Sequence, residues 1–181
     1  MDNGEGSYRR FLDGDREAFG EIVELYRSGL TYFINRYVCD YSAAEDLAID
    51  TFMYMLVNPK KYNFKSSVKT YLYTIGRCRA LDYIKHRSKI QMSSIHENTL
   101  NQVYDASLEE RVIKTETNRR LSSAIETLPQ DMQTVIHLIY FDELSYDETA
   151  KVLKTTTKKV DNLLYRAKKL LRNELREEVL K

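Results

Sequence analysis

The spacing of apolar residues constrains this chain more than any other feature, because apolar side chains recur every three or four positions along most of it. The clearest run of this kind extends from Phe19 to Tyr37. Alternation typical of strands is scarce, and the 181 residues include only two prolines and six glycines. Apolar residues at this spacing share one face of a helix. We therefore predict an all-α protein.

The N-terminal part of the chain is predicted to form three helices. The first carries the apolar stripe of residues 19–37, and Ser42 with Glu45 forms a capping-box pattern that opens the second. Asn58-Pro59 ends the second helix, and a third is expected over about residues 67–86. Short connections between three amphipathic helices predict a compact helical bundle.

The composition changes between residues 89 and 107, where Ser, Asn, Gln and His dominate and apolar positions are scattered. Such a segment is typical of a flexible linker rather than of a packed helix. It divides the chain into a predicted N-terminal domain, residues 1–88, and a predicted C-terminal domain, residues 108–181.

The C-terminal domain is also predicted to be helical, with a first helix from Leu108 to Ile125 and a second after Pro129. A capping box of Ser145 and Glu148 opens a short helix. A turn of three threonines, residues 155–157, then leads into a longer basic helix, which completes a helix-turn-helix pattern. The basic residues of this last helix lie opposite its apolar stripe, which favours DNA binding over simple packing.

Charge is strongly patterned although the net charge is only +1. Basic residues dominate residues 65–89 and again residues 151–172, and acidic residues dominate the stretch between them. Two basic blocks separated by acidic sequence indicate two contact sites for a polyanion. The alternative is that each block is an ordinary solvated helix face.

Several functions are disfavoured by what the sequence contains. Cys39 and Cys78 lie far apart and the histidines have no metal-ligand spacing, so we expect no metal and no cofactor. The chain has no phosphate-binding loop and no nucleophile motif, so we do not expect an enzyme. It has no apolar run of the roughly 20 residues that a membrane helix needs and no signal peptide, so we expect a cytoplasmic protein without membrane insertion.

Three stretches of the sequence resemble one family. Residues 44–47 (Ala-Glu-Asp-Leu) with Thr51-Phe52 resemble the segment by which bacterial sigma factors dock on the clamp helices of RNA polymerase, and residues 71–83 resemble their promoter-melting, minus-ten helix. Leu128-Pro129 and the helix-turn-helix resemble their minus-thirty-five-reading domain. The order and the short length are similar to the extracytoplasmic-function group of the sigma-70 family. The resemblance implies a factor that binds core RNA polymerase and directs promoter recognition, melting and transcription initiation.

The residues expected to bind polymerase offer acidic and apolar surface to a basic, apolar partner. They are Glu45, Asp46, Asp50, Phe52 and Met55. The alternative is an ordinary amphipathic helix, in which Phe52 packs in the core of its own bundle.

The residues expected to bind promoter DNA belong to two groups. The first would capture an unpaired base by stacking and hold phosphates by charge. Its members are Lys65, Ser66, Ser67, Lys69, Tyr71, Arg77, Arg79 and Lys85, with Tyr73 as a second aromatic face. Tyr71 has a core-packing alternative, and Arg77 has the alternative of pairing with a carboxylate. The second group would read the major groove. Its members are Thr156, Thr157, Lys158, Lys159, Asn162, Arg166 and Lys169.

Four positions depart from the family pattern and bear on which promoters would be chosen. They are Ile49 in place of glutamine, Tyr71 in place of tryptophan, Cys78 in place of asparagine and Lys154 in place of glycine. A second hypothesis is a conventional helix-turn-helix regulator with an N-terminal sensing or dimerisation bundle. For a sigma factor, an anti-sigma protein is a further expected partner, around which the two domains would close.

Overall fold

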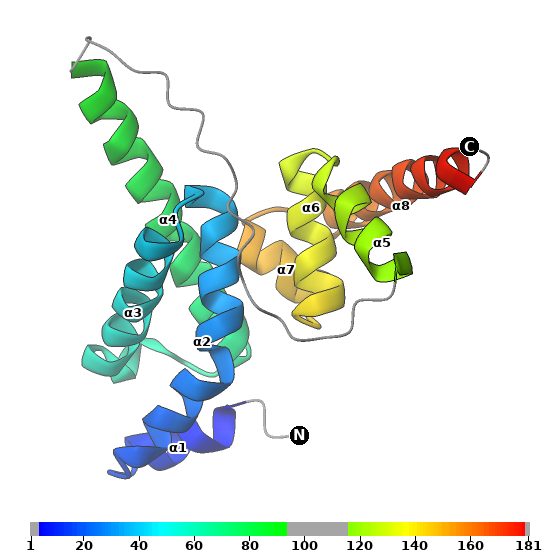
Figure 1. The fold of residues 1–181 in the computed structure, drawn as a ribbon. Coiled ribbons are helices and arrows are strands. Elements are labelled where there is room, and N and C mark those ends of the chain that lie inside the picture. Colours follow the sequence, from blue (N-terminus) through cyan, green and yellow to red (C-terminus); the bar gives the residue numbers. More distant parts are fainter. Residues whose placement is uncertain (1–3, 94–115, 180–181) are drawn as a thin grey trace. The chain divides into compact units, whose positions relative to one another are not determined.

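The computed structural model describes residues 4–93 and 116–179, which separate into an N-terminal and a C-terminal compact unit (Figure 1). Every regular element in these two ranges is helical, which confirms the all-α prediction. Residues 89–93 of the predicted linker continue a helix, and the remainder, 94–107, lies outside the described residues. The predicted helix start at Leu108 also lies outside them.

The N-terminal unit packs three long helices together and adds a short helix at its start (Figure 1). Its elements are α1 (Glu5–Leu12), α2 (Glu17–Val38), α3 (Tyr41–Val57), the single turn η1 (Pro59–Lys61) and α4 (Val68–Ser93). The apolar stripe predicted on α2 forms the centre of the core, because α2 contacts both α3 and α4. Helix α1 was not predicted, and α4 ends at Ser93 rather than near His86.

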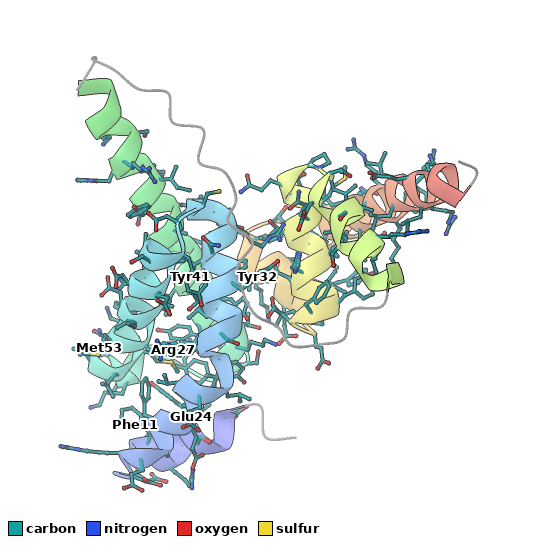
Figure 2. All side chains as sticks on the ribbon, viewed as in Figure 1. Phe11, Glu24, Arg27, Tyr32, Tyr41 and Met53 are labelled. Carbon is teal, nitrogen blue, oxygen red and sulfur yellow. The ribbon has the colours of Figure 1, made fainter. Side chains whose placement is uncertain are left out.

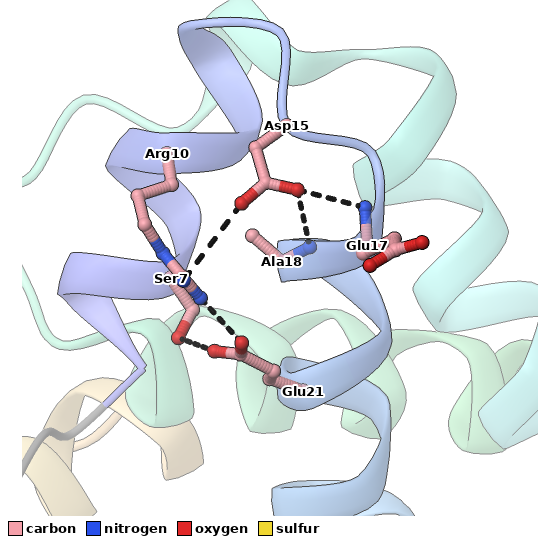
Figure 3. Close-up of polar contacts among 6 residues, drawn as sticks. All are labelled: Ser7, Arg10, Asp15, Glu17, Ala18 and Glu21. Carbon is pink, nitrogen blue, oxygen red and sulfur yellow. Dashed lines mark hydrogen bonds and ion pairs between the residues drawn. The ribbon is translucent and has the colours of Figure 1, made fainter.

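Polar contacts fasten α1 to the beginning of α2 (Figure 3). The Ser7 hydroxyl donates to Glu21 Oε2 at 2.7 Å, and Arg10 forms ion pairs with Glu21 and, at 3.8 Å, with Asp15. The Asp15 carboxylate in turn accepts the backbone N–H of Ala18 at 3.3 Å. The hydrogen bond from Ser7 and the guanidinium of Arg10 lower the pKa of Glu21. The ionised form of Glu21 is therefore favoured, and this carboxylate connects the two helices.

The start of α3 differs from its prediction. Asp40 is the N-cap, since its side chain accepts the backbone N–H of Ala43 at 3.1 Å, whereas Ser42 lies exposed inside the helix. The capping box predicted for Ser42 and Glu45 is therefore wrong. The preceding residue, Cys39, ends α2 with a positive φ of 53°, so α2 and α3 are joined by a very short turn.

A glycine permits the close approach of α2 and α4. A Cβ atom on Gly76 would lie 2.9 Å from Leu30 Cδ1 and 3.2 Å from Ile34 Cδ1, both of which are fully buried. Real Cβ contacts are rarely that short, so a side chain at this position would push the two helices apart. Residue 76 thus fixes how closely α4 lies against the core.

The C-terminal unit consists of α5 (Glu116–Glu126), α6 (Gln130–Ile136), the π-helical turn η2 (His137–Phe141), α7 (Tyr146–Leu153) and α8 (Thr157–Val179). Helix α8 packs against α5 and α6. Met132, Val135 and Ile136 are buried, whereas Ile139 is half-buried.

The capping box that opens α7 is confirmed. The backbone N–H of Glu148 donates to Ser145 Oγ at 3.2 Å, and the backbone N–H of Ser145 donates to Glu148 Oε2 at 3.0 Å. Two N–H groups that lack helical partners are satisfied in this way, so the first helix of the helix-turn-helix begins at a defined residue.

Candidate nucleic-acid interface

The loop before α4 presents the first group of predicted DNA contacts. Ser67 caps α4, because its Oγ accepts the backbone N–H of Thr70 at 3.2 Å and lies 2.8 Å from the Thr70 hydroxyl. The carbonyl of Ser66 accepts a hydrogen bond from the Tyr62 hydroxyl at 2.6 Å. Lys65 is exposed. The two serines therefore shape the loop, and the Lys65 side chain is free to extend from it.

An aromatic framework lies beneath this loop. The ring of Tyr62 is 5.0 Å from that of Tyr8, 4.7 Å from that of Phe64 and 5.1 Å from that of Tyr71. Burial raises the pKa of Tyr8 and that of Tyr62 to about 12, and it also raises the pKa of Tyr71. Tyr71 is half-buried, with one part of its ring against Tyr62. The core-packing alternative for Tyr71 is met in part, since the ring packs on the bundle, and its accessible surface leaves the DNA contact as a prediction.

Helix α4 has one buried and one open face. Tyr73, Gly76 and Ala80 are buried, whereas the opposite positions are half-buried or exposed: Tyr71, Ile75, Cys78 and Asp82. The Tyr73 ring lies 5.0 Å from that of Phe33 within the core. The prediction of an aromatic DNA-binding face at Tyr73 is therefore wrong, because its ring is enclosed by protein.

The basic residues of α4 are partly engaged inside the unit. Arg79 Nη1 lies 3.5 Å from Asp50 Oδ2, and its guanidinium lies 5.7 Å from the ring centroid of Tyr54. In the part of the chain that the structure describes, the ion pair expected for Arg77 is made by Arg79 instead. Lys69 Nζ lies 5.9 Å from the Tyr73 ring centroid. The ion pair of Arg79 joins a predicted DNA contact to a predicted polymerase contact.

Two further basic positions on α4 are more open. Lys85 is exposed, with its Nζ 3.9 Å from Asp82 Oδ1, and Arg77 is half-buried. An exposed lysine beside one carboxylate gains little from that pair in water. Lys85 is therefore available to a phosphate.

The predicted polymerase contacts on α3 divide into exposed acids and buried apolar residues. Asp46 and Asp50 are exposed, and the half-buried Glu45 lies 3.6 Å from Arg27. Phe52 and Met55 are 4% and 0% exposed. These two side chains fill the core between α3 and its neighbours, which agrees with the core-packing alternative given for Phe52.

A different apolar row lies beside the exposed acids. Ile49, Met53 and Val57 are 48%, 49% and 71% exposed, and Met53 projects from the outer side of α3 (Figure 2). Their spacing of four residues places them on one helix face. The signal was present in the sequence as a second apolar row, but periodicity alone does not tell which row is covered. We name Asp46, Ile49, Asp50, Met53 and Val57 the α3 outer face.

The turn between α7 and α8 is held by its own side chains. The Thr156 hydroxyl accepts the backbone N–H of Lys159 at 3.3 Å, and the Thr157 hydroxyl donates to Asp147 Oδ1 at 2.8 Å. Lys154 has a positive φ of 50°, where glycine is common. Both threonine hydroxyls thus build the turn that sets the direction of α8.

The predicted duplex-reading residues beyond the turn lie on the open side of α8. The exposed members are Lys158, Lys159, Asn162, Arg166 and Lys169, and Val160, Leu163, Leu164 and Ala167 are buried on the opposite side. Tyr165 is 69% exposed among these basic residues and was not predicted as a contact. The result is a positive, solvent-facing helix surface.

Among the residues that the structure describes, no helix is long and apolar enough to span a membrane. The same residues include no group of three or more His, Cys, Asp or Glu side chains placed to hold a metal ion.

Known proteins resemble this chain over both units. Residues 22–90 match Sigma-70 region 2 and residues 118–171 match Sigma-70, region 4. The chain is 28% identical over 172 residues to the ECF RNA polymerase sigma factor SigW of Bacillus subtilis strain 168, covering 91% of this chain and 92% of that protein. It is 29% identical over 161 residues to the RNA polymerase sigma factor YlaC of the same strain, covering 88% and 93%.

A solved structure shares the fold. The sigma factor RpoE in complex with the anti-sigma factor NepR from Bartonella quintana aligns with a TM-score of 0.64 and 22% identity. The alignment covers 87% of this chain and 96% of that one. Helix α1 precedes the segment that matches region 2.

Proposed function

The chain belongs to the sigma-70 family, in its extracytoplasmic-function group, and we propose on that premise how its two units divide the work of a promoter-recognising RNA polymerase sigma factor. Residues 1–88 would bind core polymerase and the minus-ten element, and residues 108–181 would bind the minus-thirty-five element. A conventional regulator is not favoured, since the unit that would serve as its sensing bundle matches region 2.

The proposed polymerase-docking site is the α3 outer face together with Glu45. Carboxylates beside exposed apolar side chains suit a basic and apolar helical partner. Exposed large apolar residues next to one another are the observation that supports this choice. Phe52 and Met55 would support the site from the core without contacting polymerase.

The proposed minus-ten site is the loop of residues 62–67 with the start of α4. The half-open ring of Tyr71, held on the aromatic framework, would stack on an extruded base. Lys65, Lys69, Arg77 and Lys85 would hold phosphates around it, joined by Arg79 when its pair with Asp50 opens. Ser66 and Ser67 would present backbone groups to the minus-ten strand.

The proposed minus-thirty-five site is the exposed side of α8. Lys158, Lys159 and Asn162 near its N-terminus are placed to reach base edges in a major groove, and Arg166 and Lys169 to hold phosphates. Thr156 and Thr157 would orient the helix through the turn. The single observation that carries this proposal is the cluster of exposed basic side chains opposite a fully buried stripe.

The proposal also concerns location and control. The factor would act in the cytoplasm and catalyse no reaction of its own. An anti-sigma protein would hold it inactive by covering the α3 outer face and the open side of α8, the surfaces that polymerase and DNA would otherwise occupy.

Transcription in vitro with core polymerase and a promoter library tests the proposal. We expect initiation that depends on both the core enzyme and this chain, and the selected promoters give its sequence preference. Failure to bind core polymerase at low micromolar concentration overturns the function.

A pair of variants tests the docking site. The double variant Ile49→Glu and Met53→Glu is expected to weaken binding to core polymerase about ten-fold or more, because it places charge in an apolar contact. Leu25→Glu is the matched control, since Leu25 is an exposed apolar residue on α2. An equal loss in both variants would contradict the choice of face.

A further inference from the structure

We propose that α1 is part of the minus-ten site, with Arg9 and Tyr8 acting as positioning residues that hold the base-capturing loop without touching DNA. This inference rests on the function proposed for residues 62–71. It extends that function to a helix that lies before the segment matching region 2.

The loop needs support from outside itself because Phe64 adopts a strained backbone conformation. Its φ is +60°, in the left-handed region that side chains other than glycine, asparagine and aspartate rarely adopt. Such a conformation persists only where surrounding contacts hold it. Within the loop, the Tyr62 ring lies 4.7 Å from the Phe64 ring, the Tyr62 hydroxyl donates to the Ser66 carbonyl, and the backbone N–H of Lys65 donates to Asn63 Oδ1 at 3.1 Å.

Helix α1 supplies further contacts on Phe64. The guanidinium carbon of Arg9 lies 4.4 Å from the centroid of the Phe64 ring, within the range of a cation–π interaction. The Tyr8 ring meets Phe64 edge-on at 6.1 Å. One residue of the capture loop is thus held by two successive residues of α1.

Tyr8 also holds η1, the turn that precedes the loop. Its side chain is completely buried, and its hydroxyl donates to the Pro59 carbonyl at 2.8 Å across 51 residues of sequence. Its ring lies edge-on against Tyr62, which in turn lies against Tyr71. A continuous series of contacts therefore leads from α1 to the proposed stacking residue.

The helix is itself a fixed support. The contacts of Ser7 and Arg10 with Glu21 join it to α2, so α1 does not rely on the loop for its position (Figure 3). Arg9 has a second partner, Glu5, at 2.8 Å, which holds the guanidinium from the side of α1. The geometry points to a rigid frame that sets the loop before DNA arrives.

Binding of the assembled holoenzyme to fork-junction DNA with an unpaired minus-ten strand tests this inference, using promoters selected by transcription. Arg9→Ala is expected to weaken this binding about two- to five-fold, the range that a partly exposed cation–π contact supports. Arg9→Lys should restore most of it. Arg16→Ala is the matched control, since it removes an exposed arginine that lies outside α1 and the loop.

A double-mutant cycle separates positioning from general stability. In a Phe64→Leu background, Arg9→Ala should cause no further loss, because its partner ring is absent. Affinity for core polymerase and for a minus-thirty-five duplex should be unchanged in every variant.

The outcomes distinguish the two proposals. If the wild-type holoenzyme does not discriminate an intact from a scrambled minus-ten strand, the function proposed for residues 62–71 is overturned, and the inference with it. If the wild type discriminates and Arg9→Ala binds equally well, only the role of α1 is overturned. Additive losses from Arg9→Ala and Phe64→Leu would also overturn that role.

Discussion

The basic residues that we propose as DNA contacts have opposite surroundings in the two units. In the N-terminal unit, Arg79 and Lys69 lie against aromatic rings, and Arg79 also pairs with a carboxylate. In the C-terminal unit, the basic residues proposed to reach DNA stand exposed on one side of α8.

This difference corresponds to two kinds of DNA target. A single unpaired base needs a shaped, rigid pocket, since unstacking it costs a few kcal/mol. A duplex offers a regular array of phosphates, for which an open positive helix is sufficient. The N-terminal unit is therefore expected to depend on packing and the C-terminal unit on charge, and four variants test that contrast.

Removing core volume from the N-terminal unit should have the largest effect. Phe52→Ala is expected to lower the free energy of unfolding of this unit by about 3–5 kcal/mol, because it leaves a cavity in the core. Urea denaturation followed by circular dichroism measures the change. Ile49→Ala, one turn away on the exposed side, should change it by no more than about 0.5 kcal/mol. Unchanged stability with weakened polymerase binding would restore the docking role of Phe52.

Removing charge from α8 should have the next largest effect. The double variant Lys158→Ala and Arg166→Ala is expected to weaken binding to a minus-thirty-five duplex about ten- to one-hundred-fold. It should also reduce the slope of log affinity against log salt by about 2, since two phosphate-contacting charges are lost. Fluorescence anisotropy at several salt concentrations measures both.

Lys151→Ala with Arg120→Ala is the charge-matched control for that experiment, because both residues are exposed and lie on α7 and α5, outside the exposed side of α8. An equal loss in the control would mean that net charge, and not the open side of α8, determines binding.

Removing one stacking ring should weaken DNA binding by a smaller factor, and this factor should not depend on salt concentration. Tyr71→Leu is expected to weaken the binding of holoenzyme to an unpaired minus-ten strand about ten-fold, the loss of one base–aromatic contact. Tyr71→Phe should bind nearly as well as the wild type, because the ring remains. A change in the salt dependence would show that Tyr71 acts on phosphates, and the contrast between the units would weaken.

The smallest expected effect concerns a helix cap in the C-terminal unit. Ser145→Ala should lower the free energy of unfolding of that unit by about 1 kcal/mol, since the N–H of Glu148 loses its acceptor. Thermal unfolding measures the change, with Ser122→Ala on the exposed side of α5 as a control. No difference between the two variants would mean that the capping box does not limit this unit's stability.

Local patterns predicted the fold well where the decisive contacts are local. The stripe of residues 19–37 and the capping box of Ser145 and Glu148 depend on residues within a few positions of each other. Asp40 and Ser42 are both residue types that commonly cap helices. Which of them caps α3 depends on the left-handed backbone conformation of Cys39, and the sequence contains no signal for that conformation.

The site was predicted less completely because its decisive contacts are distant. Helix α1 is short, and the burial of Tyr8 depends on Pro59 and Tyr62, more than fifty residues away. On α3, two apolar rows have helical spacing, and only the packing of α2 and α4 decides that Phe52 is covered and Met53 is not. The charged residues of α8 were found directly, since exposure opposite an apolar stripe follows from periodicity alone.

The missing side chain at Gly76 couples positions that are far apart in the sequence. Because a methyl group there would meet Leu30 at 2.9 Å and Ile34 at 3.2 Å, Gly76→Ala alone should be tolerated poorly, and shortening Leu30 at the same time should recover part of the loss. Among natural relatives, the size of residue 76 is therefore expected to vary inversely with the size of residue 30. The substitutions permitted at residue 76 therefore depend on which residue already occupies position 30. The space between α2 and α4 constrains how both positions can evolve.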